Sequence, residues 1–189
     1  MASTYPTSLD VFTNPLTTNP LTAPSHAQQH SDINDAVEAL EAKVAIGATV
    51  LGTYTAFTPS IGGLTIGDGT VTSQYCRVNN FVHYFGRIVV GSTSAFTGGS
   101  FTITFPVNLD SAIATATGSQ LGPVSFRDIS LATTYIGSGR TGASSATLFF
   151  VEVFNASVTY ATGLNVTSTV PMTWATGDIL SWNIYYKAA

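Results

Sequence analysis

Charged side chains are scarce in this sequence. Asp, Glu, Lys and Arg together make up 8% of its 189 residues, against about a quarter in an ordinary globular protein. The net charge is −4, so the chain offers no basic surface and we expect no nucleic-acid partner. Apolar residues make up 44%, which is too many for a disordered chain. So few charges in a folded protein indicate that neighbouring subunits cover part of its surface.

Cysteines and long apolar runs are also lacking. The single cysteine, Cys76, excludes a disulfide within the chain and leaves the redox compartment open. No apolar run reaches the roughly 18–20 residues needed to cross a bilayer, so we expect no membrane insertion. Residues 1–15 show neither the basic nor the apolar region of a signal peptide. We therefore expect the protein to be made in a cytosol and assembled from there.

The residues that enzymes use for catalysis are few and scattered. The chain has no Gly-x-Ser-x-Gly elbow and no glycine-rich phosphate loop with a lysine, so we interpret residues 67–69, Gly-Asp-Gly, as a turn. Beyond residue 53 the acids are isolated in the sequence, whereas a glycosidase needs a facing pair. These acids are Asp68, Asp110, Asp128, Glu152 and Asp178. We expect no enzymatic activity and no cofactor.

Residues 25–46 carry the one convincing helical pattern. Ser25 is a good N-cap, and Gln28 follows three residues later as in a capping box. Apolar residues then recur at spacings of four, three and four, which is the a/d pattern of a coiled coil. These seam residues are Ile33, Val37, Leu40 and Val44. Gly47 is a natural stop, and residues 47–52 are interpreted as a hinge.

The predicted seam needs a partner. Isolated short helices are marginal in water, and the sequence predicts no second helix against which this one packs. We therefore predict that copies of the chain associate through a short parallel coiled coil. The same register places His26 and His30 on the seam, where imidazole rings from several copies are candidate ligands for a metal or an anion. The alternative is that both histidines are packed or solvated residues where the helix begins.

Residues 1–24 cannot build a core of their own. The pentapeptide Thr-Asn-Pro-Leu-Thr occupies residues 13–17 and again 18–22, and its prolines favour extended backbone. Four spaced apolar residues accompany it: Leu9, Phe12, Leu16 and Leu21. We interpret this segment as an arm that docks on another subunit. The alternative is a flexible tail.

Residues 53–189 show the pattern of short antiparallel strands separated by Gly, Pro and Asn. We expect strands near 53–57, 70–78, 81–90, 100–105, 112–118, 122–137 (interrupted), 145–155, 158–166 and 178–186. Asn79-Asn80 is expected to form a tight turn, and residues 98–99 and 137–139 to form longer connections. Many short strands without a helix predict a β-sandwich of jelly-roll type.

Two of these segments are apolar on both faces. In 81–90 the opposed sets are Val82, Tyr84, Ile88 and Val90 on one side, and Phe81, His83 and Phe85 on the other. Segment 148–154 has the same character. A strand that is apolar on both faces needs a cover on each side. Because no helix is predicted in this region, we expect a second subunit to supply the outer cover.

Tryptophans are candidates for stacking on a ligand such as a sugar. Trp174 precedes a predicted turn, and we name it as the candidate ligand contact. Trp182 lies within a predicted strand and is expected in the core.

Two parts of the sequence resemble a family of phage virion proteins. Residues 5–15, YPTSLDVFTNP, and 24–47, PSHAQQHSDINDAVEALEAKVAIG, resemble the head-proximal segment of many such proteins, particularly from phages of actinobacteria. The later region is similar to the small domain of phage minor tail and fibre-like proteins. The matching stretches are 64–70, 75–82, 91–94, 105–106 and 171–178. Family members often carry Trp near the start of that domain, where this chain has Phe57 and Ile61.

The resemblance implies a homotrimeric virion appendage, minor-tail or fibre-like. Residues 1–24 would dock on other virion proteins, 25–46 would oligomerise, and 53–189 would form a head for host attachment through a cell-surface glycan or protein. Mixed β-branched and other residues at a and d permit a trimer. The alternative is a capsid decoration protein, or head fibre, that docks on the major capsid protein. A glycan-degrading enzyme is the least favoured alternative.

Overall fold

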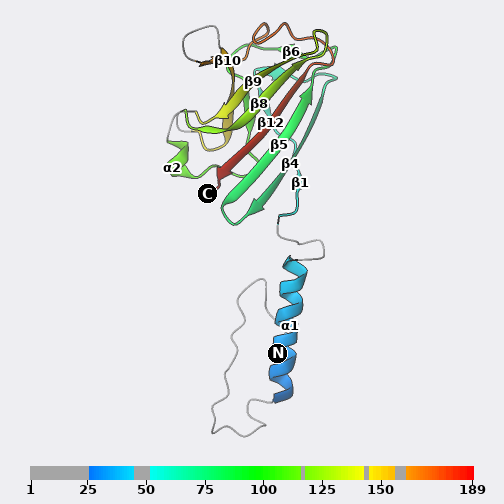
Figure 1. Ribbon diagram of the computed structural model, residues 1–189, viewed down its shortest axis with the longest axis vertical. Coiled ribbons are helices and arrows are strands. Elements are labelled where there is room, and N and C mark those ends of the chain that lie inside the picture. Colours follow the sequence, from blue (N-terminus) through cyan, green and yellow to red (C-terminus); the bar gives the residue numbers. More distant parts are fainter. Residues whose placement is uncertain (1–25, 45–51, 116–117, 143–144, 156–160) are drawn as a thin grey trace. The chain divides into compact units, whose positions relative to one another are not determined.

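The computed structural model describes residues 26–44, 52–115, 118–142, 145–155 and 161–189 (Figure 1). The chain divides into two compact units, residues 1–53 and 54–189. The described part of the first unit is a helix, and the second unit consists largely of antiparallel strands, which confirms the predicted mainly β class. The predicted arm, with Leu9, Phe12, Leu16 and Leu21, lies outside the described residues, as do residues 47–51 of the predicted hinge.

The first unit contains helix α1 (His26–Val44), which confirms the predicted helix. Residues spaced three and four apart share one side of a helix. Three of the four seam residues have described side chains, and each is about half exposed: Ile33 52%, Val37 47% and Leu40 50%. The side chains of His26 and Val44 lie outside the described part of the structure.

The second unit is dominated by one ten-stranded sheet. Its order is β1-β4-β5-β12-β8-β9-β10-β7-β2, with β11 paired to β10, while β3 and β6 form a separate pair. The strands are β1 (Thr55–Ala56), β2 (Ile61–Gly62), β3 (Leu64–Thr65), β4 (Thr70–Val78), β5 (Phe81–Val89), β6 (Ala95–Phe96), β7 (Thr102–Thr104), β8 (Gln120–Asp128), β9 (Thr133–Arg140), β10 (Leu148–Asn155), β11 (Thr162–Asn165) and β12 (Ile179–Lys187). In Figure 1 the long strands β4, β5, β12, β8 and β9 run beside one another.

The ten-stranded sheet curls around a single core. Three strands separate β5 from β10 in the sheet order, yet the rings of Tyr84 and Phe149 meet edge to face, with centroids 6.4 Å apart. Phe105 lies between the two halves, 5.4 Å from Phe149 and 4.6 Å from Tyr186. Trp182 is 2% exposed, which confirms its prediction as a core residue. The inward face of every long strand therefore contributes to one hydrophobic cluster.

Burial alternates along the strands, because successive side chains point to opposite faces of a sheet. In segment 100–105, Phe101, Ile103 and Phe105 are buried and the residues between them are not. In β5 and β10 the inward residues are buried as well, whereas the outward ones remain open in the single chain. Phe81 of β5 is 54% exposed and Phe154 of β10 is 42% exposed. The predicted inner face is confirmed, and the predicted outer cover stays a prediction.

The predicted strand at 112–118 is wrong. Residues Ser111–Ala114 form a short helix, α2. Asp110 caps it, because its Oδ1 accepts a hydrogen bond from the Ala112 amide at 2.9 Å. Aspartate is among the best N-caps, and this local bond outweighs the weak strand pattern of the following residues. The Lys187 ammonium, 2.9 Å from Asp110, and the Ala112 amide hold the pKa of that carboxyl below its usual range.

The predicted connection at 137–139 is also wrong, because these residues lie inside β9. A Cβ on Gly137 would overlap the backbone carbonyl of Glu152, and one on Gly139 would press on Phe149 and Ile184. These glycines thus permit close packing within the sheet rather than a turn. The predicted interruption of 122–137 is confirmed at residues 129–132, and the Asn79-Asn80 turn is confirmed with φ of 52° at Asn79.

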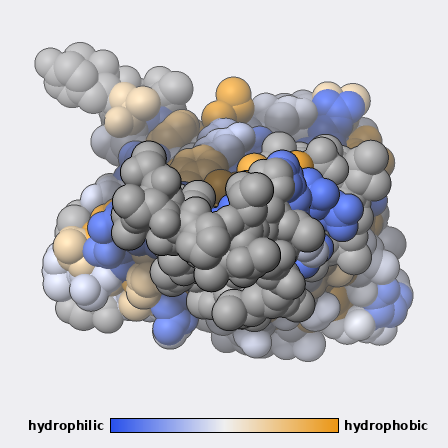
Figure 2. All heavy atoms as spheres, turned by 90° about the horizontal axis from the view of Figure 1, so that it is seen from below, coloured by the Kyte–Doolittle hydropathy of each residue, from blue (hydrophilic) through white to orange (hydrophobic). Residues whose placement is uncertain are grey.

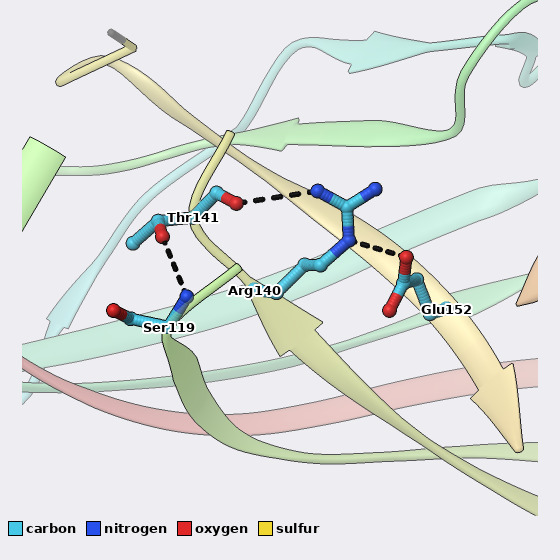
Figure 3. Close-up of polar contacts among 4 residues, drawn as sticks. All are labelled: Ser119, Arg140, Thr141 and Glu152. Atoms are coloured by element: carbon cyan, nitrogen blue, oxygen red, sulfur yellow. Dashed lines mark hydrogen bonds and ion pairs between the residues drawn. The ribbon is translucent and has the colours of Figure 1, made fainter. Parts of the chain in front are cut away.

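A polar cluster ties the end of β9 to its neighbours (Figure 3). Arg140 Nε donates to Glu152 in an ion pair, and its guanidinium lies 5.0 Å from the centre of the Phe150 ring. Arg140 Nη1 also donates to the Thr141 carbonyl at 3.3 Å, while the Thr141 hydroxyl accepts from the Ser119 amide at 3.0 Å. Glu152, one of the five acids of this unit, therefore has a structural partner.

Candidate binding site at the loop end of the β domain

The β domain has two distinct ends. At the hairpin end, the Asn79-Asn80 turn lies beside the C-terminus, where the Ala188 amide donates to the Asn80 carbonyl at 2.7 Å. At the opposite end, called the loop end here, Val89 and Arg127 are paired in register with Ile179. Four loops gather at the loop end: 66–69, 90–94, 129–132 and 171–178. The predicted ligand contact Trp174 belongs to the last of them.

Asp68 joins the first two of these loops. Its Oδ2 accepts from the Ser92 hydroxyl at 2.6 Å, and its Oδ1 accepts from the Thr93 amide at 2.7 Å. The Asp68 amide in return donates to the Thr93 hydroxyl at 2.9 Å. These hydrogen bonds favour the charged carboxylate, led by the one from Ser92, and hold the pKa of Asp68 well below its usual range. The predicted turn at residues 67–69 is confirmed as the site of this cross-link.

Asp178 joins the other two loops from the interior. Its side chain is buried, with Oδ1 accepting from the Ile129 amide at 3.0 Å and Oδ2 from the Ala175 amide at 2.7 Å. Backbone bonds between Val90 and residues 177–178 tie the same region to β5. A buried carboxylate that accepts hydrogen bonds from backbone amides is a rigid support. Moving either loop would leave one of its oxygens buried without a hydrogen-bond donor.

The 129–132 loop presents apolar side chains on a fixed turn. Asp128 Oδ1 accepts from the Leu131 amide at 2.9 Å and from the Ser130 hydroxyl at 2.8 Å, which lowers the pKa of Asp128. Ile129 is 50% exposed and Leu131 68% exposed. Large apolar side chains held out by a rigid turn are suited to contacting another molecule.

Trp174 forms one wall of a hollow at the loop end. Its indole lies 5.3 Å from the ring of Phe96 and 6.1 Å from that of Phe126, and its Nε1 donates to the Thr167 carbonyl at 3.0 Å. The indole is therefore half-buried and fixed. The hollow measures about 450 Å³. Its lining consists of Val90, Gly91, Ser92, Ser94, Phe96, Ser168, Trp174, Ala175 and Thr176.

The lining of this hollow suits binding rather than acid–base chemistry. It combines aromatic rings with serine and threonine hydroxyls and contains no acid, histidine, cysteine or lysine among the described residues. Rings offer an apolar face, and hydroxyls both donate and accept hydrogen bonds. A neutral polar molecule with one apolar face, such as a sugar, matches that combination.

The remaining predicted site residues lie on α1. His30 is on the helix surface and interacts with other residues of the chain. Across the described residues, no group of three or more His, Cys, Asp and Glu side chains is arranged to hold a metal ion. The metal or anion role of His26 and His30 stays a prediction. In the same described part, no helix has the length and apolarity needed to cross a membrane.

Comparison of this chain with protein-family models, with curated proteins and with solved structures finds no match in any of the three.

The sequence pointed to Trp174 but not to the scaffold that holds it. The sequence shows Asp68 and Asp178 only as isolated acids, because the bonds that join loops run from Asp68 to Thr93, 25 residues away, and from Asp178 to Ile129, 49 residues away. A serine- and threonine-rich stretch, 91–94, was the one available signal. Short hydroxyl side chains after a strand often bond to nearby loops, but their partner is set by the folded sheet.

Proposed function

We propose that this chain is a non-enzymatic structural protein of a phage particle, a homotrimeric appendage of minor-tail or fibre type. The observation that carries the proposal is the exposed seam of α1: Ile33, Val37 and Leu40 are each about half exposed on a helix that belongs to a unit separate from the β domain. An amphipathic helix gains most of its stability from packing its apolar side. Three copies that pack seam to seam would bury these residues.

Three parts then have separate tasks. The arm, residues 1–24, docks on other virion proteins through its spaced apolar residues. The helix forms the coiled coil that sets the symmetry. The β domain is the head, a sandwich of jelly-roll type made by the two halves of the curled sheet. Support for the virion assignment comes from the resemblance of residues 5–47 and of the β region to phage virion proteins.

The loop end is the surface of the head that we assign to host attachment. Its hollow beside Trp174 would take a cell-surface glycan, and Ile129 and Leu131 would add apolar contact. Support comes from the rigid mounting of both features by Asp178, Asp128 and their backbone partners. Fixed binding groups lose little entropy when a ligand arrives.

The test is quantitative mass spectrometry of purified particles, counting this chain against the major capsid protein. A tail appendage is expected in small multiples of three or six per particle. A ratio on the order of one per several capsid subunits would instead favour a capsid decoration protein that docks on the capsid lattice. A chain that is abundant in the infected-cell lysate but washes away from the particles would overturn the virion assignment altogether.

A further inference from the structure

An aromatic strip lies on the outer face of β5 and β12, which neighbour each other in the sheet, with β4 on the other side of β5 (Figure 1). Cys76, His83 and Tyr185 are in register across the three strands, and Phe81 and Phe85 flank this row on β5. The residues between them, such as Tyr84, point into the core. We name the set Tyr54, Phe81, His83, Phe85 and Tyr185 the outer strip.

The rings of the outer strip pack against one another. The rings of His83 and Tyr185 stack at 4.5 Å and 11°, and Phe81 continues the stack at 5.9 Å and 23° from Tyr185. Tyr54 closes the other side, with its ring 5.6 Å from His83 and 5.3 Å from Phe85.

Two hydrogen bonds fix the imidazole of His83 within the strip. The His83 Nε2 atom lies 2.6 Å from Asn183 Oδ1, and Nδ1 lies 2.6 Å from the Tyr54 hydroxyl. Because Asn183 Oδ1 only accepts, Nε2 donates to it, and Nδ1 forms the second hydrogen bond with the Tyr54 hydroxyl. Both ring nitrogens are thus satisfied within the strip.

Despite this order, the strip remains open to solvent. Phe81 is 54%, Tyr54 45% and Tyr185 44% exposed. Contiguous exposed aromatic rings mark contact surfaces, because interfaces are enriched in aromatic residues and depleted of charge. Figure 2 shows one face of the molecule from below, on which hydrophobic and hydrophilic groups are interspersed.

Charge at this end of the sheet does not oppose self-contact. The Lys187 ammonium is paired with Asp110 at 2.9 Å, and Arg77 donates to the Asn79 and Ala189 carbonyls. No carboxylate belongs to the strip. Identical copies that met near Phe81 and Tyr185 would therefore not bring unpaired like charges together, and the exposed Arg87 on the same side of β5 lies beyond Phe85, toward the loop end.

The connection to the helix indicates which partner covers the strip. Tyr54 is the first residue of the β domain, and the nine residues 45–53 join it to the end of α1. Nine residues span at most about 30 Å. In an oligomer held by α1, every copy of Tyr54 is tethered within that distance of one shared helix bundle, so the faces that carry Tyr54 are concentrated together.

We propose that the outer strip is the contact between β domains of neighbouring copies of this chain, a second self-association surface beside the α1 seam. This rests on the proposed oligomer. Its consequence is that neighbouring β domains contact one another directly and are not joined through α1 alone.

Cys76 supplies the test without any added probe site, because the only cysteine of the chain sits in the middle row of this face. The full chain is reacted with a maleimide at a concentration at which sedimentation gives the oligomer. The Leu40→Asp variant, expected to be monomeric, is the reference. We expect Cys76 to react at least about tenfold more slowly in the oligomer. Phe81→Asp, and independently Tyr185→Asp, should restore fast labelling while α1 keeps the chains together.

The matched control is Ile136→Asp, which adds the same charge to an equally exposed apolar position on β9, outside the strip. It should leave Cys76 protected. Equal labelling of the oligomer and the Leu40→Asp monomer would overturn the strip contact and leave the helix-based oligomer standing. A chain that sediments as a monomer at every concentration would overturn both. Protection that appears only when host cell-wall polysaccharide is added would assign the strip to a saccharide instead.

Discussion

The helix and the β domain solve the burial of apolar side chains in opposite ways. The β domain buries Tyr84, Phe126 and Phe149 completely within one chain. On α1 the corresponding apolar residues, Ile33, Val37 and Leu40, stay about half exposed. The β domain therefore has a stability of its own, whereas the proposed coiled coil would make the stability of α1 depend on other copies and on their concentration. This difference makes the two regions separable by experiment.

The two tryptophans make the separation practical. Trp174 and Trp182 both lie in the β domain, so indole fluorescence reports the unfolding of that domain alone. Sedimentation reports the association that we assign to α1. Each variant below is expected to act chiefly on one of these readouts.

Leu40→Asp should give the largest effect, on association only. The substitution removes about 2 kcal/mol of stabilisation from apolar burial per helix and places a carboxylate in the seam. The oligomer suffers this loss in every copy of the chain. We expect a monomer by sedimentation, with a urea midpoint by fluorescence that falls by no more than the loss of the proposed outer-strip contact. Asn34→Asp, which adds the same charge to an exposed polar position of α1, is the control and should stay associated. An oligomer that persists unchanged in Leu40→Asp would refute the seam.

Phe149→Ala should have the converse effect. Phe149 is fully buried where the two halves of the sheet meet, so its removal should lower the free energy of unfolding of the β domain by about 3–5 kcal/mol. Association through α1 should persist. Phe154→Ala on the same strand, where the side chain is 42% exposed, is the matched control and should cost less than about 1 kcal/mol. Equal losses for both variants would contradict the assigned inner and outer faces.

The sequence predicted the features that depend on neighbouring residues and missed those that depend on contacts between distant parts of the chain. The local pattern of short β-branched and aromatic runs between Gly, Pro and Asn identified β4, β5 and β7, because strand propensity and turn residues are read from neighbouring positions. It failed at residues 112–118, where a single capping aspartate, Asp110, converts the segment into α2. It failed again at Gly137 and Gly139. These positions need glycine because strand β10 and the core lie too close for a side chain, and only the folded sheet shows that closeness.

The candidate site shows the same limit. Trp174 was identifiable because an aromatic residue before a turn is a local pattern. Asp68 and Asp178 join its neighbouring loops through bonds to Thr93 and Ile129, which lie far along the chain, so the sequence does not show these roles. The sequence shows that the outer face of β5 is apolar. It does not show the hydrogen bonds of the His83 ring, because Tyr54, His83 and Asn183 come from three different segments of the chain.

Gly86→Ala tests the packing of the β domain at finer scale. Gly86 lies on β5 between Ser73 and Trp182, and an added Cβ would overlap the Trp182 indole. Overpacking of this kind costs about 1–3 kcal/mol, and we expect a loss of that size in urea unfolding, with a changed Trp emission maximum. Gly98→Ala, where no atom lies within 4 Å but φ is +83°, isolates backbone strain. A Gly86→Ala variant as stable as the wild type would show that the indole is free to move.

Asp68→Asn should have the smallest effect, visible mainly as a change in acid sensitivity. The pKa of Asp68 is lowered in the folded state by hydrogen bonds from Ser92 and Thr93. The stabilisation is therefore complete above the unfolded value near 3.8 and is lost as the pH falls below it. Urea midpoints measured from pH 5 down to pH 2.5 should decline less steeply in the variant than in the wild type. Asp110 and Asp128, whose pKa values are lowered in the same direction, would leave a residual slope. Parallel curves for variant and wild type would mean that the bond between the 66–69 and 90–94 loops adds nothing to the stability of the loop end.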